Sequence, residues 1–359
     1  MSIEVSWFSA LCDDDYEFLG YPDPLLQSSW AHCRNIVMAA DGHGYDNVLL
    51  PSGYALGIDN AAFAAAIAPL AQHIRLLLAV RCGELVVPQL ARQLATIDQI
   101  LEGRLTVNII SSDIPGETLE SEPRYRRSTE IMYLLRELLN GKPVDFNGDF
   151  VNLTIDPPRI GTVSGRSPLF YFGGLSPAAR DCAAAGADVF LMWPDTTKAV
   201  TEVMDDMNAR ATKVGRSLRY GWRSHVIVRD TEDEARAAAD RLLSKLDDEV
   251  GREIRQRSLD SNSAGVARQA ELRESAGDDG YVERHLWTGV GRARSGAGAA
   301  IVGNPDQVIA KIRELQAAGV EAFILSGYPH IAECDLFARY VLPALDHGRL
   351  EFEPDPVAV

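Results

Sequence analysis

The sequence lacks every cysteine arrangement that would indicate disulfides or a metal centre. Its five cysteines are odd in number and widely spaced, and they form neither a Cys-x-x-Cys pair nor a Cys/His set with metal-ligand spacing. Scattered thiols of this kind are typical of proteins kept in a reducing compartment. We therefore expect a cytoplasmic protein whose chemistry uses no metal.

The chain also lacks an excess of basic residues and a long apolar run. Its net charge is −16 at pH 7, which disfavours nucleic acid or an anionic membrane surface as a partner. The most apolar stretch, 61–80, is interrupted by proline, glutamine, histidine and arginine, so we expect no membrane span, and no signal sequence is expected at the N-terminus. A small anionic substrate would need a local cationic site to overcome the overall negative field.

Two further motifs are missing. No Gly-x-Gly-x-x-Gly joins the first strand to a helix, and no Gly-x-Ser-x-Gly nucleophile elbow occurs. What the chain does have is a regular alternation of short apolar segments with amphipathic ones. The apolar segments are 3–10, 45–50, 74–81, 104–110, 168–173, 189–192, 220–230 and 320–326. Eight such units predict an α/β fold, a single (β/α)8 TIM barrel over residues 1–359, and an open doubly wound sheet is the alternative.

Two regions depart from this alternation. Residues 144–151 contain an Asn-Gly turn between short strand-like arms, which predicts a hairpin. Residues 244–300 form a long insertion between strands seven and eight that is helix-capable at first and then glycine-rich and charged. In a barrel this insertion leaves from the catalytic face, so we interpret it as a mobile lid, with a solvated decoration as the alternative.

The seventh strand carries two potentially cationic side chains. Side chains alternate along a strand, so Arg223 and His225 share one face of the segment 220–230. Burying both is unfavourable unless a carboxylate partner or an anionic ligand accompanies them. Four other histidines, His330, His43, His73 and His285, are expected to have packing or surface roles.

Further candidates stand where the barrel strands end. Asn108 lies near the end of strand four and Ser111 follows that strand. Trp193 follows strand six, Tyr328 follows strand eight, and Arg294 comes from the insertion. The strand ends of a barrel converge on one mouth, so these side chains are expected to meet there. Trp193 fits either the core or a substrate wall, and Tyr328 can donate a hydrogen bond.

A glycine-rich turn follows the fifth strand. Gly173-Gly174-Leu175-Ser176 precedes a helix, and glycines allow close approach while a helix N-terminus attracts phosphate. The alternative is that Ser176 only caps the helix. Tyr125, flanked by Arg124, Arg126 and Arg127, can complete a phosphate clamp or simply begin a solvated helix.

These motifs, in this order, resemble the flavin-dependent alkanesulfonate monooxygenases of the bacterial luciferase-like superfamily, over nearly the whole chain. Each motif alone is moderately specific, whereas their order and spacing together are strong. The shared motifs are Trp7-Phe8, Arg104-Leu-x-x-Asn108, Arg124-Tyr125, Tyr171-Phe-Gly-Gly174, Arg223-x-His225, Gly289-Val-Gly291, Arg294 with Gly296-Ala-Gly298, and Leu325-Ser-Gly-Tyr-Pro-His330.

The resemblance implies a two-component enzyme. Reduced FMN, supplied by a separate NAD(P)H-dependent flavin reductase, would activate dioxygen to convert an alkanesulfonate into an aldehyde and sulfite, and the protein would be a homodimer or homotetramer. The active-site positions carried over are Arg223, His225, Trp193, Tyr328 and Arg294; the cofactor positions are Asn108, Ser111, Tyr125, Gly174, Leu175 and Ser176. Arg223 and Arg294 would hold an anion, His225 would move protons near neutral pH, and Tyr328 would donate a hydrogen bond.

Two departures from the family pattern bear on the ligands. Leu175 replaces a second serine of the glycine turn, so that phosphate contact would come from backbone. The segment Pro51–Asp59 lacks the family's cysteine and is one residue longer. Three alternatives therefore stay open: a different organosulfur or amine-bearing substrate, a deazaflavin-dependent hydride transfer, and a flavin-binding barrel without catalysis.

Overall fold

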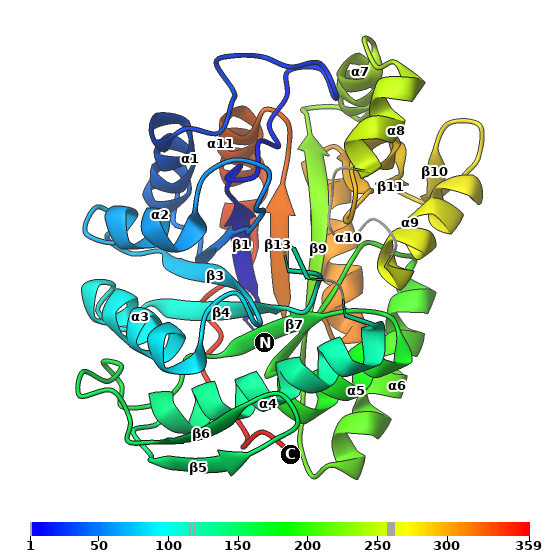
Figure 1. The fold of residues 1–359 in the computed structure, drawn as a ribbon. Helices are drawn as coiled ribbons and strands as arrows, with labels where there is room; N and C mark the ends of the chain where they lie inside the picture. Colours follow the sequence, from blue (N-terminus) through cyan, green and yellow to red (C-terminus); the bar gives the residue numbers. More distant parts are fainter. Residues whose placement is uncertain (1, 115, 118, 257–262) are drawn as a thin grey trace.

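A computed structural model describes residues 2–114, 116–117, 119–256 and 263–359, and its centre is a closed barrel of eight parallel strands (Figure 1). The barrel strands are β1 (Glu4–Phe8), β2 (Asn47–Leu50), β3 (Arg75–Arg81), β4 (Leu105–Ile110), β7 (Phe170–Gly173), β8 (Val189–Met192), β9 (Arg219–Val228) and β13 (Ala322–Ser326). β9 pairs with both β8 and β13, which closes the ring. The predicted (β/α)8 barrel is confirmed, and the open sheet is excluded.

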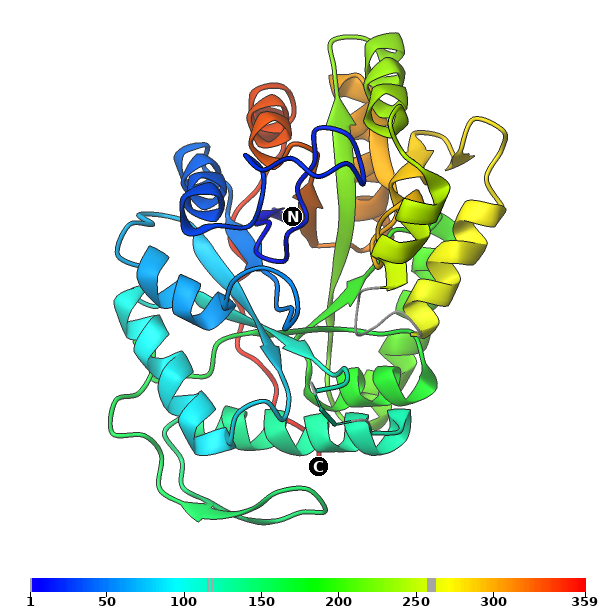
Figure 2. The ribbon, with the colours of Figure 1, turned by 45° about the horizontal axis from the view of Figure 1, so that its top comes forward.

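Helices surround the barrel because each carries one apolar face that packs on the strands (Figure 2). They are α1 (Trp30–Gly42), α2 (Asn60–Ile67), α3 (Val87–Ile100), α4 (Ser121–Leu139), α5 (Pro177–Gly186), α6 (Thr197–Lys213), α7 (Glu232–Leu243), α10 (Pro305–Ala318), α11 (His330–Tyr340) and the short η2 (Leu342–Ala344). Among the described residues, no helix is long and apolar enough to cross a membrane. The predicted hairpin is present as β5 (Val144–Asn147) and β6 (Asn152–Ile155), beside α4.

The first helix begins at Trp30 with Ser29 as its cap. The residues before it are held against the end of β1, because the Ser28 hydroxyl donates to the carbonyls of Ala10 and Leu11. The last α-helix runs from His330 to Tyr340 and is followed by η2.

The insertion is partly a folded extension of the barrel. It contains α8 (Asp248–Gln256), α9 (Ala264–Glu274), β10 (Tyr281–Glu283), β11 (Leu286–Trp287) and η1 (Gly289–Arg292), and β12 (Ala300–Gly303) follows. β12 was not predicted. It pairs in parallel with the C-terminal half of β9, with Ala300 opposite His225. Figures 1 and 2 show α8 and α9 beside this end of β9. Residues 257–262 of the proposed lid lie outside the described residues, and the lid stays a prediction.

Candidate active site

A cavity of about 720 Å³ lies at the carboxyl ends of the barrel strands. Apolar side chains from three strands, Leu49, Ile109 and Ile324, line part of it. Eight of the predicted site residues also line it: Asn108, Ser111, Tyr125, Gly174, Leu175, Ser176, Trp193 and Arg223. The other three, His225, Tyr328 and Arg294, belong to a cluster joined to this cavity through Arg223, described below.

The glycine turn, residues 173–176, forms one end of the cavity. A Cβ added to Gly173 would lie 2.6 Å from the carbonyl oxygen of Leu191, and one added to Gly174 would lie 2.6 Å from Cβ of Ala179. Gly174 also has a φ of +156°, a backbone angle that residues with a side chain rarely adopt. Only glycine fits at these two positions, so the turn leaves its backbone uncovered toward the cavity.

Ser176 has the capping role that the sequence analysis left as an alternative, and it also lines the cavity. Its hydroxyl oxygen accepts a hydrogen bond from the Ala179 N–H at 3.2 Å at the start of α5. The Tyr125 hydroxyl lies beside the same turn, and Ser176 and Arg124 act to lower the Tyr125 pKa although burial raises it overall. Pro177 has no N–H and the Ala179 N–H is used by Ser176, so a phosphate group here would rely on the two hydroxyls and on the backbone of the glycine turn.

The basic residues beside Tyr125 are mostly neutralised by carboxylates. Arg124 pairs with Asp113 at 2.9 Å, and Arg127 pairs with Glu117 at 2.9 Å. Arg126 pairs with Asp149. Only Arg124 of these three lines the cavity. The predicted phosphate clamp therefore contains one arginine, and Asp113 already neutralises its charge.

Arg223 is the buried cation of the cavity wall. It is only 5% exposed, and none of the described residues forms an ion pair with it. Its Nη2 donates to Ser326 Oγ at 2.8 Å, and its guanidinium lies 4.5 Å from the centre of the Phe8 ring. Burial lowers the Arg223 pKa to about 10, so the group stays charged at neutral pH. The structure therefore excludes a buried carboxylate partner within the described chain.

His225 lies directly behind Arg223 and shares its serine. Nδ1 of His225 is 2.9 Å from Ser326 Oγ, and its ring lies against that of Tyr328 with the centres 4.9 Å apart. Burial, followed by the charge of Arg223, lowers the His225 pKa well below its ordinary value. The expectation that this histidine titrates near neutral pH is therefore wrong: in this state it is neutral at pH 7.

Tyr328 and Arg294 converge as predicted, but a carboxylate that the sequence analysis missed joins them. Asp14 accepts from the Tyr328 hydroxyl at 2.6 Å and forms an ion pair with Arg294. Arg294 also lies 3.3 Å from the Tyr328 oxygen. Asp14 thus accepts the hydroxyl hydrogen of Tyr328 and also neutralises the charge of Arg294. We call Arg223, His225, Ser326, Tyr328, Arg294 and Asp14 the cationic cluster.

Asp14 could have been found by examining the residues that follow the end of strand one, as was done for the other strands. The acidic run Asp13-Asp14-Asp15 follows the end of β1 closely, which places it at the mouth. Asp15 has its own partners, since it pairs with His32 at 2.8 Å and accepts from the His330 N–H at 2.9 Å. His330 is fully buried and packs beside the cationic cluster rather than lying on the surface, with its ring centre 5.4 Å from that of Tyr328.

Trp193 forms a wall of the cavity, shared with the insertion. The residue is half-buried and lines the cavity. A Cβ added to Gly265 of α9 would lie 2.7 Å from its ring, so α9 packs tightly against the indole. Arg268 on the same helix pairs with Asp195 at 2.6 Å. The insertion is therefore held to the barrel at the cavity itself.

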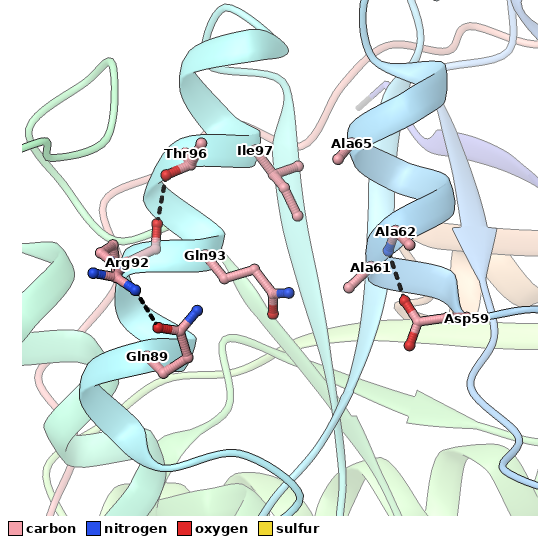
Figure 3. Close-up of a pocket in the computed structure, with 9 residues that line it drawn as sticks. All are labelled: Asp59, Ala61, Ala62, Ala65, Gln89, Arg92, Gln93, Thr96 and Ile97. Carbon is pink, nitrogen blue, oxygen red and sulfur yellow. Dashed lines mark hydrogen bonds between the residues drawn. The ribbon is translucent and has the colours of Figure 1, made fainter.

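A second hollow, of about 330 Å³, lies on the outer surface between α2 and α3 (Figure 3). Its polar groups are used within their own helices: Asp59 accepts from the Ala62 N–H, and Arg92 donates to Gln89. It holds no buried charge and is far less suited to chemistry. Within the described residues, no group of three or more His, Cys, Asp or Glu side chains is placed to hold a metal ion.

Comparisons with known proteins agree with this architecture. Residues 19–322 match the family described as luciferase-like monooxygenase. A sulfoquinovose monooxygenase of Novosphingobium aromaticivorans is 65% identical over 354 residues, covering 97% of this chain and 98% of that protein. Another, of Agrobacterium fabrum, is 50% identical over 345 residues, with 95% and 89% covered.

Among solved structures, a riboflavin lyase shares the fold with a TM-score of 0.79 at 16% identity, covering 100% of this chain and 95% of that one. This likeness agrees with the barrel seen here. Taken with the family match and the close relatives, it leaves one assignment: the chain belongs to the family of luciferase-like monooxygenases.

Proposed function

We propose that this protein is a flavin-dependent monooxygenase that oxidises sulfoquinovose, a hexose with a sulfonate on C6, rather than a simple alkanesulfonate. Two relatives that cover almost the whole chain bear the name sulfoquinovose monooxygenase. The observation that carries the proposal is Arg223, a desolvated guanidinium on the cavity wall without a carboxylate partner in the described chain.

A buried cation of this kind favours an anionic ligand. A sulfonate stays ionised at all physiological pH values and offers three oxygens to a guanidinium fork. Arg294 is less suited to the task because Asp14 already neutralises it. We therefore assign the sulfonate to Arg223, which narrows the earlier hypothesis that both arginines hold the anion.

The polar lining of the cavity supports a sugar over an alkyl chain. Ser263 and Glu202 contribute to the wall beside its apolar part. The hydroxyl groups of a hexose can bond to such side chains, whereas an alkyl chain leaves them without partners. Trp193 would cover an apolar face of the substrate.

The other end of the cavity fits FMN. The glycine turn, the Ser176 cap and Tyr125 would hold its phosphate, and Asn108 with Ser111 would lie toward its ring system. Reduced flavin would supply the two electrons with which dioxygen is activated. A separate NAD(P)H-dependent flavin reductase as its source, a cytoplasmic location and a homo-oligomeric state remain part of the proposal.

The overall reaction fixes what the side chains must do. One oxygen atom of O₂ is joined to the carbon that bears sulfur and the other leaves as water. The C–S bond breaks with its electron pair on sulfur, which gives sulfite and an aldehyde. Arg223 would hold the sulfonate throughout and stabilise the departing sulfite. His225 and Tyr328, whose hydroxyl donates to Asp14, would position polar groups around the carbon.

Sulfite release tests this assignment. The purified protein is supplied with reduced FMN, dioxygen and either sulfoquinovose, an alkanesulfonate such as octanesulfonate, or taurine as an amine-bearing sulfonate. We expect sulfite release with a kcat/KM for sulfoquinovose at least about 10²-fold above the others, because missing hydrogen bonds to a polar site discriminate strongly. Faster release from octanesulfonate would overturn the sugar specificity.

Two parallel reactions separate the remaining alternatives. Replacing reduced FMN with a reduced deazaflavin, under nitrogen, tests hydride transfer, and product there but not with FMN and dioxygen would replace the monooxygenase by a hydride-transferring enzyme. Flavin bound tightly in its oxidised form, with no oxygen-dependent product from any sulfonate, would favour a binding barrel without catalysis.

A further inference from the structure

The hydroxyl of Ser326 lies between Arg223 and His225 of β9, and neither the family comparison nor the proposed function gives it a role. We propose that Ser326 is a positioning residue that holds the proton of neutral His225 on Nε2, so that His225 acts as a hydrogen-bond donor rather than as a base. This inference rests on the proposed function for its meaning in catalysis, but its structural part can be measured without turnover.

The guanidinium of Arg223 can only donate hydrogen bonds. Its Nη2 lies 2.8 Å from Ser326 Oγ, so the serine oxygen accepts this bond. The hydroxyl has a single hydrogen, and Nδ1 of His225 lies 2.9 Å from the same oxygen. The serine therefore donates to Nδ1, which must carry a lone pair. In a neutral imidazole the proton is then on Nε2.

The reverse arrangement leaves a buried group without a partner. If Nδ1 carried the proton, Ser326 would accept from both His225 and Arg223, and its own hydrogen would need another acceptor. Ser326 is fully buried, and the described residues show no third hydrogen bond to its hydroxyl. A buried hydroxyl hydrogen without an acceptor is costly, so the first arrangement is favoured.

The groups around the ring keep His225 neutral, which makes the choice of nitrogen decisive. Burial disfavours a charged imidazole most, and Arg223 on the same strand and His330 on α11 add to this effect. The Tyr328 ring covers one face. The Ala297 carbonyl of the insertion acts in the opposite sense, because it favours a proton on the ring. Nε2 itself has no hydrogen-bond partner of normal geometry in the described chain.

A neutral imidazole with its proton on Nε2 can donate to a substrate oxygen but cannot remove a proton at that atom. His225 would therefore act only as a donor at that atom, while the base function must come from elsewhere. The positive charge of Arg223 has a second effect here: it polarises the serine hydroxyl and strengthens the bond to Nδ1. Arg223 and Ser326 together orient the donor.

Nitrogen NMR of the wild-type protein tests the proposal directly. With ¹⁵N-labelled histidine, the ring nitrogens of a neutral histidine show which one carries the proton. The His225→Gln variant identifies the signals of this residue among the seven histidines. At pH 7 we expect a protonated Nε2 and an unprotonated Nδ1. A protonated Nδ1 would overturn the proposal, whatever the enzyme does in turnover.

Two serine variants test the consequence. In Ser326→Ala the tautomer bias is lost and kcat is expected to fall roughly 10- to 10²-fold, as for other imidazoles that lose a hydrogen-bond partner. Ser326→Thr keeps the hydroxyl and should retain both the Nε2–H signal and most of the turnover. If both variants keep the wild-type tautomer, Ser326 does not position the ring.

The proposed function fails in a distinguishable way. An Nε2–H signal in a protein that releases no sulfite from any sulfonate would leave the tautomer assignment intact and remove its catalytic meaning. Sulfite release with a protonated Nδ1 would leave the proposed function intact and remove the role of Ser326. If Ser326→Ala does not fold, the wild-type spectrum and Ser326→Thr still decide the question.

Discussion

The two ends of the cavity are built by different means. The glycine turn is made of four consecutive residues, and it works through backbone groups that missing side chains leave uncovered. The cationic cluster draws its six side chains from β9, the ends of β1 and β13, and the insertion, and it works through buried charges. A backbone site depends on the absence of a Cβ, whereas the cationic cluster depends on every partner being present. Substitutions should therefore separate cofactor binding from substrate chemistry.

The largest difference between the effect on turnover and the effect on FMN affinity is expected for His225→Ala. If this histidine supplies a hydrogen bond or proton to the substrate, kcat should fall by roughly 10²–10⁴-fold, the usual range for such groups. FMN affinity should stay near the wild-type value, because no described hydrogen bond or ring contact joins His225 to the glycine turn. Steady-state sulfite release and fluorescence titration of FMN measure the two quantities. Unchanged turnover would remove His225 from the mechanism.

A charge change on the same strand comes next. Arg223→Gln removes the guanidinium assigned to the sulfonate, and kcat/KM should fall by about 10²–10³-fold, because the partner of a buried charge is lost. Arg219→Gln is the matched control: it lies on the same strand, but its side chain is half-exposed and pairs with Glu321 at 3.0 Å. The control should change kcat/KM less than about 3-fold. Equal losses in the two variants would refute a specific sulfonate contact.

The complementary change is in the glycine turn. Gly174→Ala places a methyl group against Ala179, so the turn must move and the phosphate site is disturbed. FMN affinity should weaken roughly 10- to 10²-fold, which corresponds to the loss of one or two hydrogen bonds. Gly161→Ala is the control, because an added Cβ there meets no atom within 4 Å. With saturating FMN, Gly174→Ala should recover most of its turnover. A variant that binds FMN normally would show that the phosphate lies elsewhere.

The same contrast explains what could be predicted from the sequence. The glycine turn was visible as a local pattern, because Gly173-Gly174 and Ser176 are adjacent and stand between a strand and a helix. The eight strands were visible for a similar reason, since each is a short apolar run. Arg223 and His225 were singled out by their spacing on one strand, which places both on the same face.

The partnerships in the cationic cluster could not be derived in this way. The pairing of Asp14 with Arg294 joins residues 280 positions apart in the sequence, and nothing local in either segment specifies the other. The burial that lowers the His225 pKa depends on packing from several elements, so a sequence in isolation gives the ordinary value. β12 was missed because Ala300–Gly303 is a short run next to a glycine-rich stretch, and it becomes a strand only by pairing with β9.

The smallest effect is expected from His330, which belongs to the cationic end and has no counterpart in the glycine turn. Burial lowers the His330 pKa to about 4 from an ordinary value of 6.5. Between these two pH values His330 binds a proton in the unfolded chain but not in the folded chain. The free energy of unfolding therefore decreases as the pH falls from 6.5 toward 4. Between pH 7 and pH 5.5 this histidine should account for about 1 kcal/mol of lost stability.

Urea unfolding at these two pH values measures that loss, and in His330→Asn it should be smaller by the same amount because the titrating ring is gone. His43→Asn is the matched control, since His43 is exposed and pairs with Asp335 on the surface. Its stability should follow the wild-type pH dependence within experimental error. A His330→Asn variant that loses as much stability as the wild type would show that the ring is accessible to protons in the folded state. The side chains behind Arg223 would then be open to solvent, and the contrast between a buried charged cluster and an uncovered backbone site would no longer hold.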